Sequence, residues 1–318
     1  MQKRSEQEIM RNWKTNDSPF VSICCITYNH EPYIKEAIDS FLEQETNFSF
    51  EIIIRDDFST DKTAEIIRDY VGRYPLLIKP IYEKENQYSK GIKPDPVVFK
   101  KAVGKYIAFC EGDDFWTDPL KLQKQVDFLE KNKDYIVSGH DAFIVDENGK
   151  HLKDSKLPAM YKKDFESEDL ILGKSFILTM SMVFRNVLPK KFPEEFSMVV
   201  NGDTFLISML GHYGKSKYHT DIKPACYRVH SGGIWSLLST QEKSDSLLNT
   251  FFWIYRYNTR ISENKYTELS RLRYNELAIS RMKTGFIIKS LLKRIYVHYL
   301  IIAKKSLNKF KHLFRNNL

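Results

Sequence analysis

The sequence predicts an α/β fold, with a mostly parallel central sheet flanked by helices and further helices toward the C-terminal end. Short, almost wholly apolar segments alternate with helical patterns between residues 21 and 131. This alternation is typical of a parallel sheet covered by helices on both faces. Polar clusters follow three of the apolar segments, and sheets of this kind bind ligands beyond the carboxyl ends of their strands.

The first half of the chain carries the clearest elements. Strands are expected at residues 21–27, 50–54, 76–82 and 106–110. Residues 21–27 are almost wholly apolar, as expected for a strand buried on both faces, and residues 106–110 are expected to form another buried strand. Residues 34–42 place apolar side chains on one face of a helix. A second helix is expected to begin after a cap at Ser59 or Thr60, and further helices are expected at residues 97–103 and 120–131.

The second half mixes strands and helices. One or two strands are expected within residues 135–145, and others at residues 177–185 and 226–230. Helices are expected at residues 165–172 and 204–212, and the pattern from about 241 to 281 is helical. We expect an N-terminal extension over residues 1–18, a catalytic domain over 19–235, a helical extension over 236–288 and a basic tail over 289–318.

The net charge of +8 comes from the tail alone. Residues 289–318 contain eight Lys or Arg and no acid, so the rest of the chain carries 41 basic and 41 acidic residues. A nucleic-acid-binding domain should carry its basic face on the folded body, so we expect no nucleic-acid partner. Apolar residues at intervals of three or four predict an amphipathic helix on an anionic membrane. The alternative is a helix packed on the body with a solvated basic face.

The cysteine count and the N-terminus indicate a cytoplasmic location. Cys24, Cys25, Cys110 and Cys226 form no CxxC pair and are too few for a disulfide scaffold, so we expect reduced thiols. Residues 1–16 lack the apolar core of a signal peptide, and no apolar stretch is long enough for a transmembrane helix.

The acidic turn after the strand at 106–110 suggests a metal site. Adjacent carboxylates repel one another unless a cation compensates them, and Mg²⁺ and Mn²⁺ bind carboxylates together with substrate phosphates. Glu111 and Asp113 would then bridge a metal and a diphosphate. The alternative is that these acids cap the next helix. Asp56 and Asp57 allow two interpretations as well: a nucleobase contact or helix capping.

Three motifs together resemble a glycosyltransferase of family 2 with the glycosyltransferase A-type fold. They are residues 21–30 (VSICCITYNH), 52–63 (IIIRDDFSTDKT) and 104–116 (GKYIAFCEGDDFW), in the order and spacing of that family. The resemblance covers roughly residues 19–235. It implies nucleotide contacts along the first two motifs and a metal-binding D-x-D in the third, in which Glu111 replaces the first Asp.

The resemblance implies a role for each site residue. Asp113 is the expected ligand of Mg²⁺ or Mn²⁺, and His230 a second ligand, unless that histidine is only structural. Asp203, in Asn201-Gly202-Asp203, matches the general base of inverting members; the alternative is a first-turn carboxylate favoured by the helix dipole. The residues expected to contact the nucleotide, the diphosphate or the metal's surroundings are Thr27, Tyr28, Asn29, Glu31, Asp56, Asp57, Glu111, Gly112, Asp114 and Arg228.

The expected function is metal-dependent, inverting transfer of a sugar from a nucleotide-diphosphate sugar. A UDP-sugar is the first choice of donor, and GDP- and dTDP-sugars are the alternatives. The expected acceptor is a glycan or lipid-linked saccharide of bacterial surface polysaccharide. His140, Asp141 and residues 179–181 are expected to border the acceptor pocket. The protein is expected at the inner face of the cytoplasmic membrane. Two alternatives stay open. A sugar nucleotidyltransferase usually has a Gly-rich phosphate loop, which residues 26–30 lack. A non-catalytic sugar-nucleotide or membrane-surface binding protein would use the acidic turns only as caps.

Overall fold

The computed structural model describes residues 4–14, 18–233, 235–261 and 265–283. The chain divides into two compact units, one ending at Ser270 and the other beginning at Arg271. The sheets and the candidate site belong to the first unit. Of the second, the structure describes the C-terminal part of helix α10 (Lys265–Lys283). The predicted basic tail at residues 289–318 lies outside the described residues.

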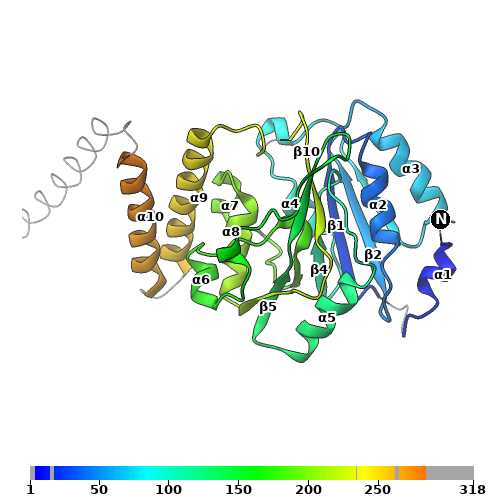
Figure 1. Cartoon of the computed structure of the whole chain (residues 1–318), viewed down its shortest axis with the longest axis horizontal. Coiled ribbons are helices and arrows are strands. Elements are labelled where there is room, and N and C mark those ends of the chain that lie inside the picture. Colours follow the sequence, from blue (N-terminus) through cyan, green and yellow to red (C-terminus); the bar gives the residue numbers. More distant parts are fainter. Residues whose placement is uncertain (1–3, 15–17, 234, 262–264, 284–318) are drawn as a thin grey trace, which may run out of the picture. The chain divides into compact units, whose positions relative to one another are not determined.

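A seven-stranded sheet forms the centre of the first unit (Figure 1). Its order is β3-β2-β1-β4-β8-β5-β9, and only β8 runs antiparallel to its neighbours. The strands are β1 (Val21–Thr27), β2 (Phe50–Asp56), β3 (Ile78–Tyr82), β4 (Tyr106–Phe109), β5 (Tyr135–Gly139), β8 (Val183–Arg185) and β9 (Lys215–Tyr218). The predicted, mostly parallel sheet is therefore present.

Both faces of the sheet are covered, which explains the continuous apolar runs. On one face, Ile23 and Cys25 of β1 belong to the core that includes the apolar side of α2 (Ile34–Leu42). Helices α3 (Thr63–Arg73) and α5 (Lys121–Lys131) contribute to the same core. On the other face lies the short helix α4 (Asp95–Phe99), whose Phe99 ring centroid is 5.1 Å from that of Phe109.

A smaller sheet brings a late segment of the chain to the acidic turn. It contains β10 (Ala225–Val229), β6 (Ala142–Asp146) and β7 (His151–Lys153), with β10 parallel and β7 antiparallel to β6. Phe115 forms an antiparallel bridge with Cys226 at the start of β10. This bridge places residues 226–230 beside residues 111–115, although more than a hundred residues separate them in the chain.

Helix α9 (Thr240–Ile261) supports the segment that leads to Asp203. The backbone N–H of Asn201 donates to Thr250 Oγ1 at 3.1 Å, and that of Val200 donates to Asn249 Oδ1 at 3.0 Å. The remaining described helices are α1 (Glu6–Met10), α6 (Ser167–Ile171), α7 (Glu194–Met198) and α8 (Gly202–Gly211), with 3₁₀ turns η1 (Tyr88–Lys90), η2 (Ala159–Tyr161) and η3 (Thr179–Ser181).

Several predicted boundaries were wrong. Strand β2 continues to Asp56, because Asp56 pairs with Tyr82 of β3, so Arg55 and Asp56 end a strand rather than begin a turn. Helix α3 begins at Thr63 instead of after Ser59 or Thr60, because Asp61 accepts the Thr63 N–H at 2.9 Å. The helix predicted at 97–103 is α4, and the strand predicted at 177–185 is a 3₁₀ turn followed by the three residues of β8.

Two further predictions concerned the state of the cysteine thiols and the absence of a membrane-spanning helix. All four cysteines are free and buried. Within the described part of the chain, no helix combines the length and the apolar character needed to cross a bilayer.

Candidate active site

The ends of β1, β2 and β4 meet at one edge of the central sheet. Thr27 is in register with Asp56, and the Gly112 N–H donates to the Ile26 carbonyl oxygen at 3.0 Å. A Cβ atom on Gly112 would lie 2.8 Å from Thr27 Oγ1 and 2.9 Å from Ile34 Cδ1. Only glycine therefore allows the acidic turn to pack against the end of β1.

The acidic turn holds buried carboxylate oxygens that the protein does not satisfy. Among the described residues, Glu111 Oε2 and Asp113 Oδ1 are buried without a hydrogen-bond partner. Burial and the neighbouring charge of Asp113 raise the pKa of Glu111 well above its usual value. Burial would also raise the pKa of Asp113, but the hydrogen bond from His230 and the charges of His30 and His230 outweigh it and lower that pKa.

Two histidines from distant segments face Asp113. His230 Nε2 lies 3.0 Å and His30 Nε2 3.9 Å from Asp113 Oδ2, and the two imidazole centroids are 5.8 Å apart. One ligand atom from each of the three residues lies within 4.8 Å of the others. Burial lowers the pKa of His30, which favours the neutral imidazole that a metal requires. These donors and the unsatisfied carboxylate oxygens fit a divalent cation.

The structure brings predicted metal ligands Asp113 and His230 together, and it adds His30, which we had not assigned as a ligand. His30 stands three residues beyond the end of β1, where a turn residue is equally expected from the sequence. His30 is recognised as a possible ligand only in the structure, where β10 lies beside the acidic turn. The sequence does not reveal this arrangement. The ligand roles stay predictions.

Arg228 and Asp114 bind each other rather than facing open space. The backbone N–H of Arg228 donates to Asp114 Oδ1 at 2.8 Å, and Nε of its guanidinium donates to the Asp113 carbonyl oxygen at 3.2 Å. The guanidinium also pairs with Glu36 and lies 4.7 Å from the Tyr33 ring centroid. With 4% of its side chain exposed, Arg228 holds the turn in place. In this arrangement, direct contact with a diphosphate stays a prediction.

The carboxylates at the end of β2 have different partners. Asp56 accepts the backbone N–H and the hydroxyl of Ser59, and burial raises its pKa. Asp57 accepts an Arg55 N–H at 2.8 Å and two backbone N–H groups, those of Gln87 at 3.0 Å and Tyr88 at 2.9 Å. Asp57 therefore anchors the loop after β3.

The loop after β1 is fastened to the loop after β2. Asn29 has a positive φ of 53°, its Oδ1 accepts the Thr60 N–H at 2.8 Å, and its own N–H donates to Ser59 Oγ at 2.9 Å. Glu31 Oε2 accepts the Lys62 N–H at 3.1 Å. Thr27 Oγ1 is buried, with no partner in the described part of the chain, whereas Tyr28 is 42% exposed. Asn29 and Glu31 thus shape the two loops.

Asp203 lies in the first turn of α8, after the N-cap residue Asn201. Its Oδ1 accepts the Thr204 N–H at 2.7 Å, and burial raises its pKa. The charge of Asp203 also contributes to the raised pKa of Glu111, so the two carboxylates lie within electrostatic range of each other. Its role as a base stays a prediction.

Asp95, which sequence reasoning missed, is a further carboxyl beside Asp203, and it is partly buried. A Cβ atom on Gly202 would lie 3.1 Å from Asp95 Oδ2. Burial raises the pKa of Asp95 to about 6, and the charge of Asp203 adds to the shift, while Lys93 opposes it. Lys93 donates to the Val200 carbonyl oxygen at 3.2 Å. Asp95 follows no strand end, so nothing in the pattern pointed to it.

The predicted acceptor border has structural contacts of its own. The His140 ring Nδ1 lies 2.8 Å from the Asp141 carbonyl oxygen, and burial lowers the pKa of His140 to about 3. Asp141 accepts the N–H groups of Ala142 and Leu157 and pairs with Lys162 at 2.7 Å. Their contact with an acceptor stays a prediction.

Comparison with known proteins assigns the family. The profile described as "Glycosyl transferase family 2" matches residues 22–192, more than half of the chain. This protein belongs to glycosyl transferase family 2. The match confirms the family that the three motifs predicted, a family of glycosyltransferases.

Two relatives show how far the similarity extends. An uncharacterised protein of Mycobacterium tuberculosis is 38% identical over 233 residues, which cover 70% of this chain and 62% of the relative. The putative teichuronic acid biosynthesis glycosyltransferase TuaG of Bacillus subtilis is 33% identical over 138 residues, covering 43% of this chain and 51% of TuaG. The chain thus spans about half to three fifths of the length of these relatives.

Two solved structures confirm the fold. Residues 1–349 of Staphylococcus aureus TarS, in complex with UDP, align with a TM-score of 0.55 and 22% identity over 81% of this chain and 70% of that TarS fragment. A mannosyltransferase from Pyrobaculum calidifontis, in complex with GDP-Man and Mn²⁺, aligns with a TM-score of 0.51 and 15% identity over 93% of this chain and 87% of that enzyme. At these identities the likeness concerns the fold alone, and it is the predicted glycosyltransferase A-type fold.

Proposed function

We propose that this protein is a metal-dependent, inverting glycosyltransferase that moves a sugar from a nucleotide-diphosphate sugar to a hydroxyl of a glycan or lipid-linked saccharide, in surface polysaccharide biosynthesis. The cluster of His30, Asp113 and His230 carries the proposal, because it gathers three possible ligands at the carboxyl edge of the sheet, and Asp113 Oδ1 and His30 Nδ1 have no hydrogen-bond partner among the described residues. A helix cap would need neither the two histidines nor the buried, unpaired Asp113 Oδ1.

The donor is a nucleotide-diphosphate sugar, with a UDP-sugar as the first choice. TarS, similar in fold, has been solved with UDP and with UDP-GlcNAc, and the archaeal mannosyltransferase with GDP-Man and Mn²⁺. Here Asp56, Thr27 and the exposed Tyr28 would border the nucleoside, since they surround the joined ends of β1 and β2. The name of TuaG, a relative, supports a polysaccharide acceptor.

The proposed chemistry is direct displacement at the anomeric carbon. Asp203 accepts the proton of the acceptor hydroxyl as that hydroxyl attacks, so its carboxylate must be ionised beforehand. Asp113, His230 and His30 would hold the Mg²⁺ or Mn²⁺ ion, which supplies positive charge for the diphosphate leaving group when bound. Arg228 positions Asp113 by binding its carbonyl oxygen and the Asp114 carboxylate.

The substitution Asp203→Asn tests the base. It should reduce sugar transfer about 10²- to 10⁴-fold, the range for a general base. The melting temperature in UDP with Mn²⁺ should still rise as it does for the unchanged protein, because Asp203 does not belong to the metal cluster. Asp127→Asn, an exposed change on α5, is the matched control. Near-normal turnover of Asp203→Asn would show that the base lies elsewhere.

The membrane location remains part of the proposal. Basic residues interleaved with apolar ones in 289–318 support binding of the tail to the anionic inner face of the bacterial cytoplasmic membrane. Truncation after Gly285 should release the protein from vesicles of phosphatidylglycerol and phosphatidylcholine. Unchanged co-sedimentation of the truncated chain would exclude the tail as the anchor.

A further inference from the structure

A lysine and a tyrosine lie against each other beside the acidic turn. The Lys156 ammonium nitrogen is 3.5 Å from the Tyr227 ring centroid, well inside the range of a cation–π contact. Both side chains are partly buried. Among the residues that the structure describes, the Lys156 ammonium group has no carboxylate partner and the Tyr227 hydroxyl has no hydrogen-bond partner. A partly buried hydroxyl without a partner is a group that a ligand can satisfy.

Strand β10 holds Tyr227 at the acidic turn. Phe115 bridges to Cys226, the residue before Tyr227. The backbone N–H of Arg228, the residue after it, donates to Asp114 Oδ1 at 2.8 Å. Side chains alternate along a strand, so Tyr227 points to the opposite face from Arg228. The turn thus fixes the backbone on both sides of Tyr227, while the Tyr227 side chain takes no part in the contacts that Arg228 makes.

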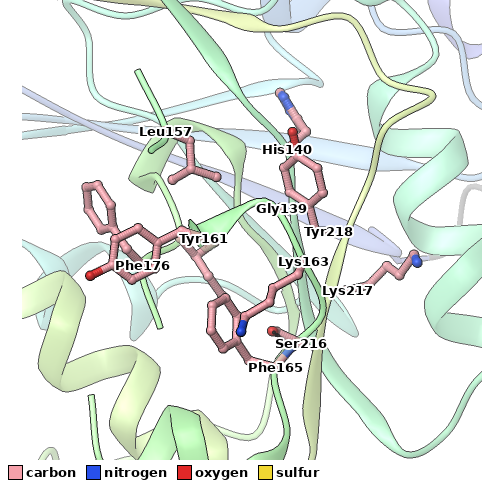
Figure 2. Close-up of a pocket in the computed structure, with 11 residues that line it drawn as sticks. Gly139, His140, Leu157, Tyr161, Lys163, Phe165, Phe176, Ser216, Lys217 and Tyr218 are labelled. Carbon is pink, nitrogen blue, oxygen red and sulfur yellow. Dashed lines mark hydrogen bonds between the residues drawn. The ribbon is translucent and has the colours of Figure 1, made fainter. Parts of the chain in front are cut away.

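The segment that carries Lys156 is fixed as well. The Lys156 backbone N–H donates to the Ala142 carbonyl oxygen at 2.6 Å. Asp141 accepts the Leu157 N–H at 3.0 Å and the Ser155 hydroxyl at 2.6 Å, so one carboxylate holds the residues on both sides of the lysine. The buried Leu157 side chain also lies in the lining of the depression drawn in Figure 2. The backbone contacts therefore hold the ammonium group over the aromatic ring.

The electrostatic surroundings of the Tyr227 hydroxyl place it near both the acidic turn and the candidate base. Burial raises the pKa of Tyr227, so the phenol keeps its proton and can donate a hydrogen bond. The carboxylates whose charges raise this pKa further are those of Asp114, Glu111, Asp113 and Asp203. The hydroxyl is therefore within electrostatic range of the proposed metal ligand and of the proposed base.

We propose that Tyr227 determines donor specificity, because its hydroxyl donates a hydrogen bond to an oxygen of the sugar that is transferred, and that Lys156 positions its ring. The inference rests on the proposed function. In direct displacement, the transferred sugar lies between the diphosphate at the metal and the acceptor hydroxyl at Asp203. A hydroxyl near both ends of this path meets the sugar, whereas the nucleoside lies at the joined ends of β1 and β2.

The test measures binding to the full chain by titration calorimetry in the presence of Mn²⁺. The probes are UDP and GDP, and the nucleotide sugars UDP-glucose, UDP-galactose, UDP-GlcNAc, UDP-glucuronate and GDP-mannose. Tyr227→Phe removes only the hydroxyl. It should weaken the nucleotide sugar that binds most tightly about threefold to tenfold, the value of one hydrogen bond, and leave the matching nucleoside diphosphate unchanged. Tyr213→Phe, at a residue that is 58% exposed, is the matched control and should change neither.

Substitutions of Lys156 test the positioning role. Lys156→Met removes the charge and keeps an apolar side chain of similar length. It should weaken the same nucleotide sugar about twofold to fivefold, the value of a cation–π contact, again without an effect on the nucleoside diphosphate. Lys156→Arg should retain the affinity of the unchanged protein, because a guanidinium group also stacks on an aromatic ring. Lys150→Met, in an exposed turn, is the control and should change nothing.

The outcomes separate this inference from the proposed function. If Tyr227→Phe weakens the nucleotide sugar and the nucleoside diphosphate equally, or weakens neither, the sugar contact is overturned and the proposed function stands. Full affinity in Lys156→Met, or a loss that Lys156→Arg shares, overturns the positioning role of Lys156. If no nucleotide sugar binds in the presence of Mn²⁺, the proposed function is overturned, and the inference falls with it.

Discussion

Replacing Asp95 by Asn should stabilise the protein at alkaline pH and leave its stability unchanged in acid. Burial raises the pKa of Asp95 from its ordinary value of 3.8 to about 6. A carboxyl group with a raised pKa favours the folded state fully below the unfolded value, and that contribution is lost as the pH rises through the folded value. Above about pH 6, the folded protein therefore carries an unfavourably ionised Asp95, which asparagine avoids.

The magnitude follows from the shift. Each pKa unit corresponds to about 1.4 kcal/mol, so the full shift sets an upper limit of about 3 kcal/mol. The side chain of Asp95 keeps partial solvent exposure, which reduces the effect, so we expect a gain of about 1–3 kcal/mol in the free energy of unfolding at pH 8. For a unit of this size, that gain raises the melting temperature by roughly 2–10 °C.

The assay compares melting temperatures and urea unfolding of Asp95→Asn with those of the unchanged chain at pH 4 and pH 8. Asp127→Asn, exposed on α5, is the control and should show no difference between the two pH values. A gain of equal size at both pH values would show that ionisation is not the cause. A loss of stability at pH 8 would refute the argument that burial of the charged form is unfavourable.

Three further predictions concern the site itself. His30→Ala should raise the Mn²⁺ concentration needed for half-maximal transfer about 10- to 100-fold, measured by metal titration of the initial rate, and an unchanged requirement would remove His30 from the ligand set. Thr250→Val removes the acceptor of the Asn201 N–H, so the free energy of unfolding should fall by about 1–3 kcal/mol, as denaturant unfolding would measure. The same change should reduce turnover more than donor affinity, as initial rates at varied donor concentration would show. If Asp203 is the base, the acid limb of the pH–rate profile should lie at a higher pH than an ordinary aspartate gives, because burial raises the pKa of Asp203. An acid limb near pH 4 would contradict this role.

Much of the fold was predictable because burial on both faces leaves a strong pattern. The runs that became β1, β2 and β4 are rich in apolar residues and buried, and the helices between them show one apolar side. Boundaries failed where side chains compete with the backbone, as at Asp61, whose carboxylate starts α3 later than expected. Strands β7 and β9 were missed because their exposed or mixed side chains carry no apolar signal.

The site was predictable where it follows strand ends and unpredictable where it depends on chain crossings. Asp56 is the last residue of β2 and Asp113 lies in the turn that follows β4, so their position at one edge follows from the parallel topology. His30 and His230 meet only because Phe115 bridges to Cys226, and Asp95 reaches Asp203 only because α4 packs below the Gly202 turn. Contacts of this kind depend on tertiary packing, which no spacing within the chain encodes.

In the proposed reaction, the charge balance of the site would give the cation a second role, which is to make donor binding possible. Five carboxyl groups influence one another around the acidic turn, those of Asp95, Glu111, Asp113, Asp114 and Asp203. Arg228 is already paired with Glu36 and holds Asp114 through its backbone, so it leaves little positive charge for a ligand. A nucleoside diphosphate would therefore be repelled by the protein alone, since like charges in a partly buried site are weakly screened. If the proposed cation and donor both bind here, each should strengthen the binding of the other, and by thermodynamic linkage the coupling is the same in both directions.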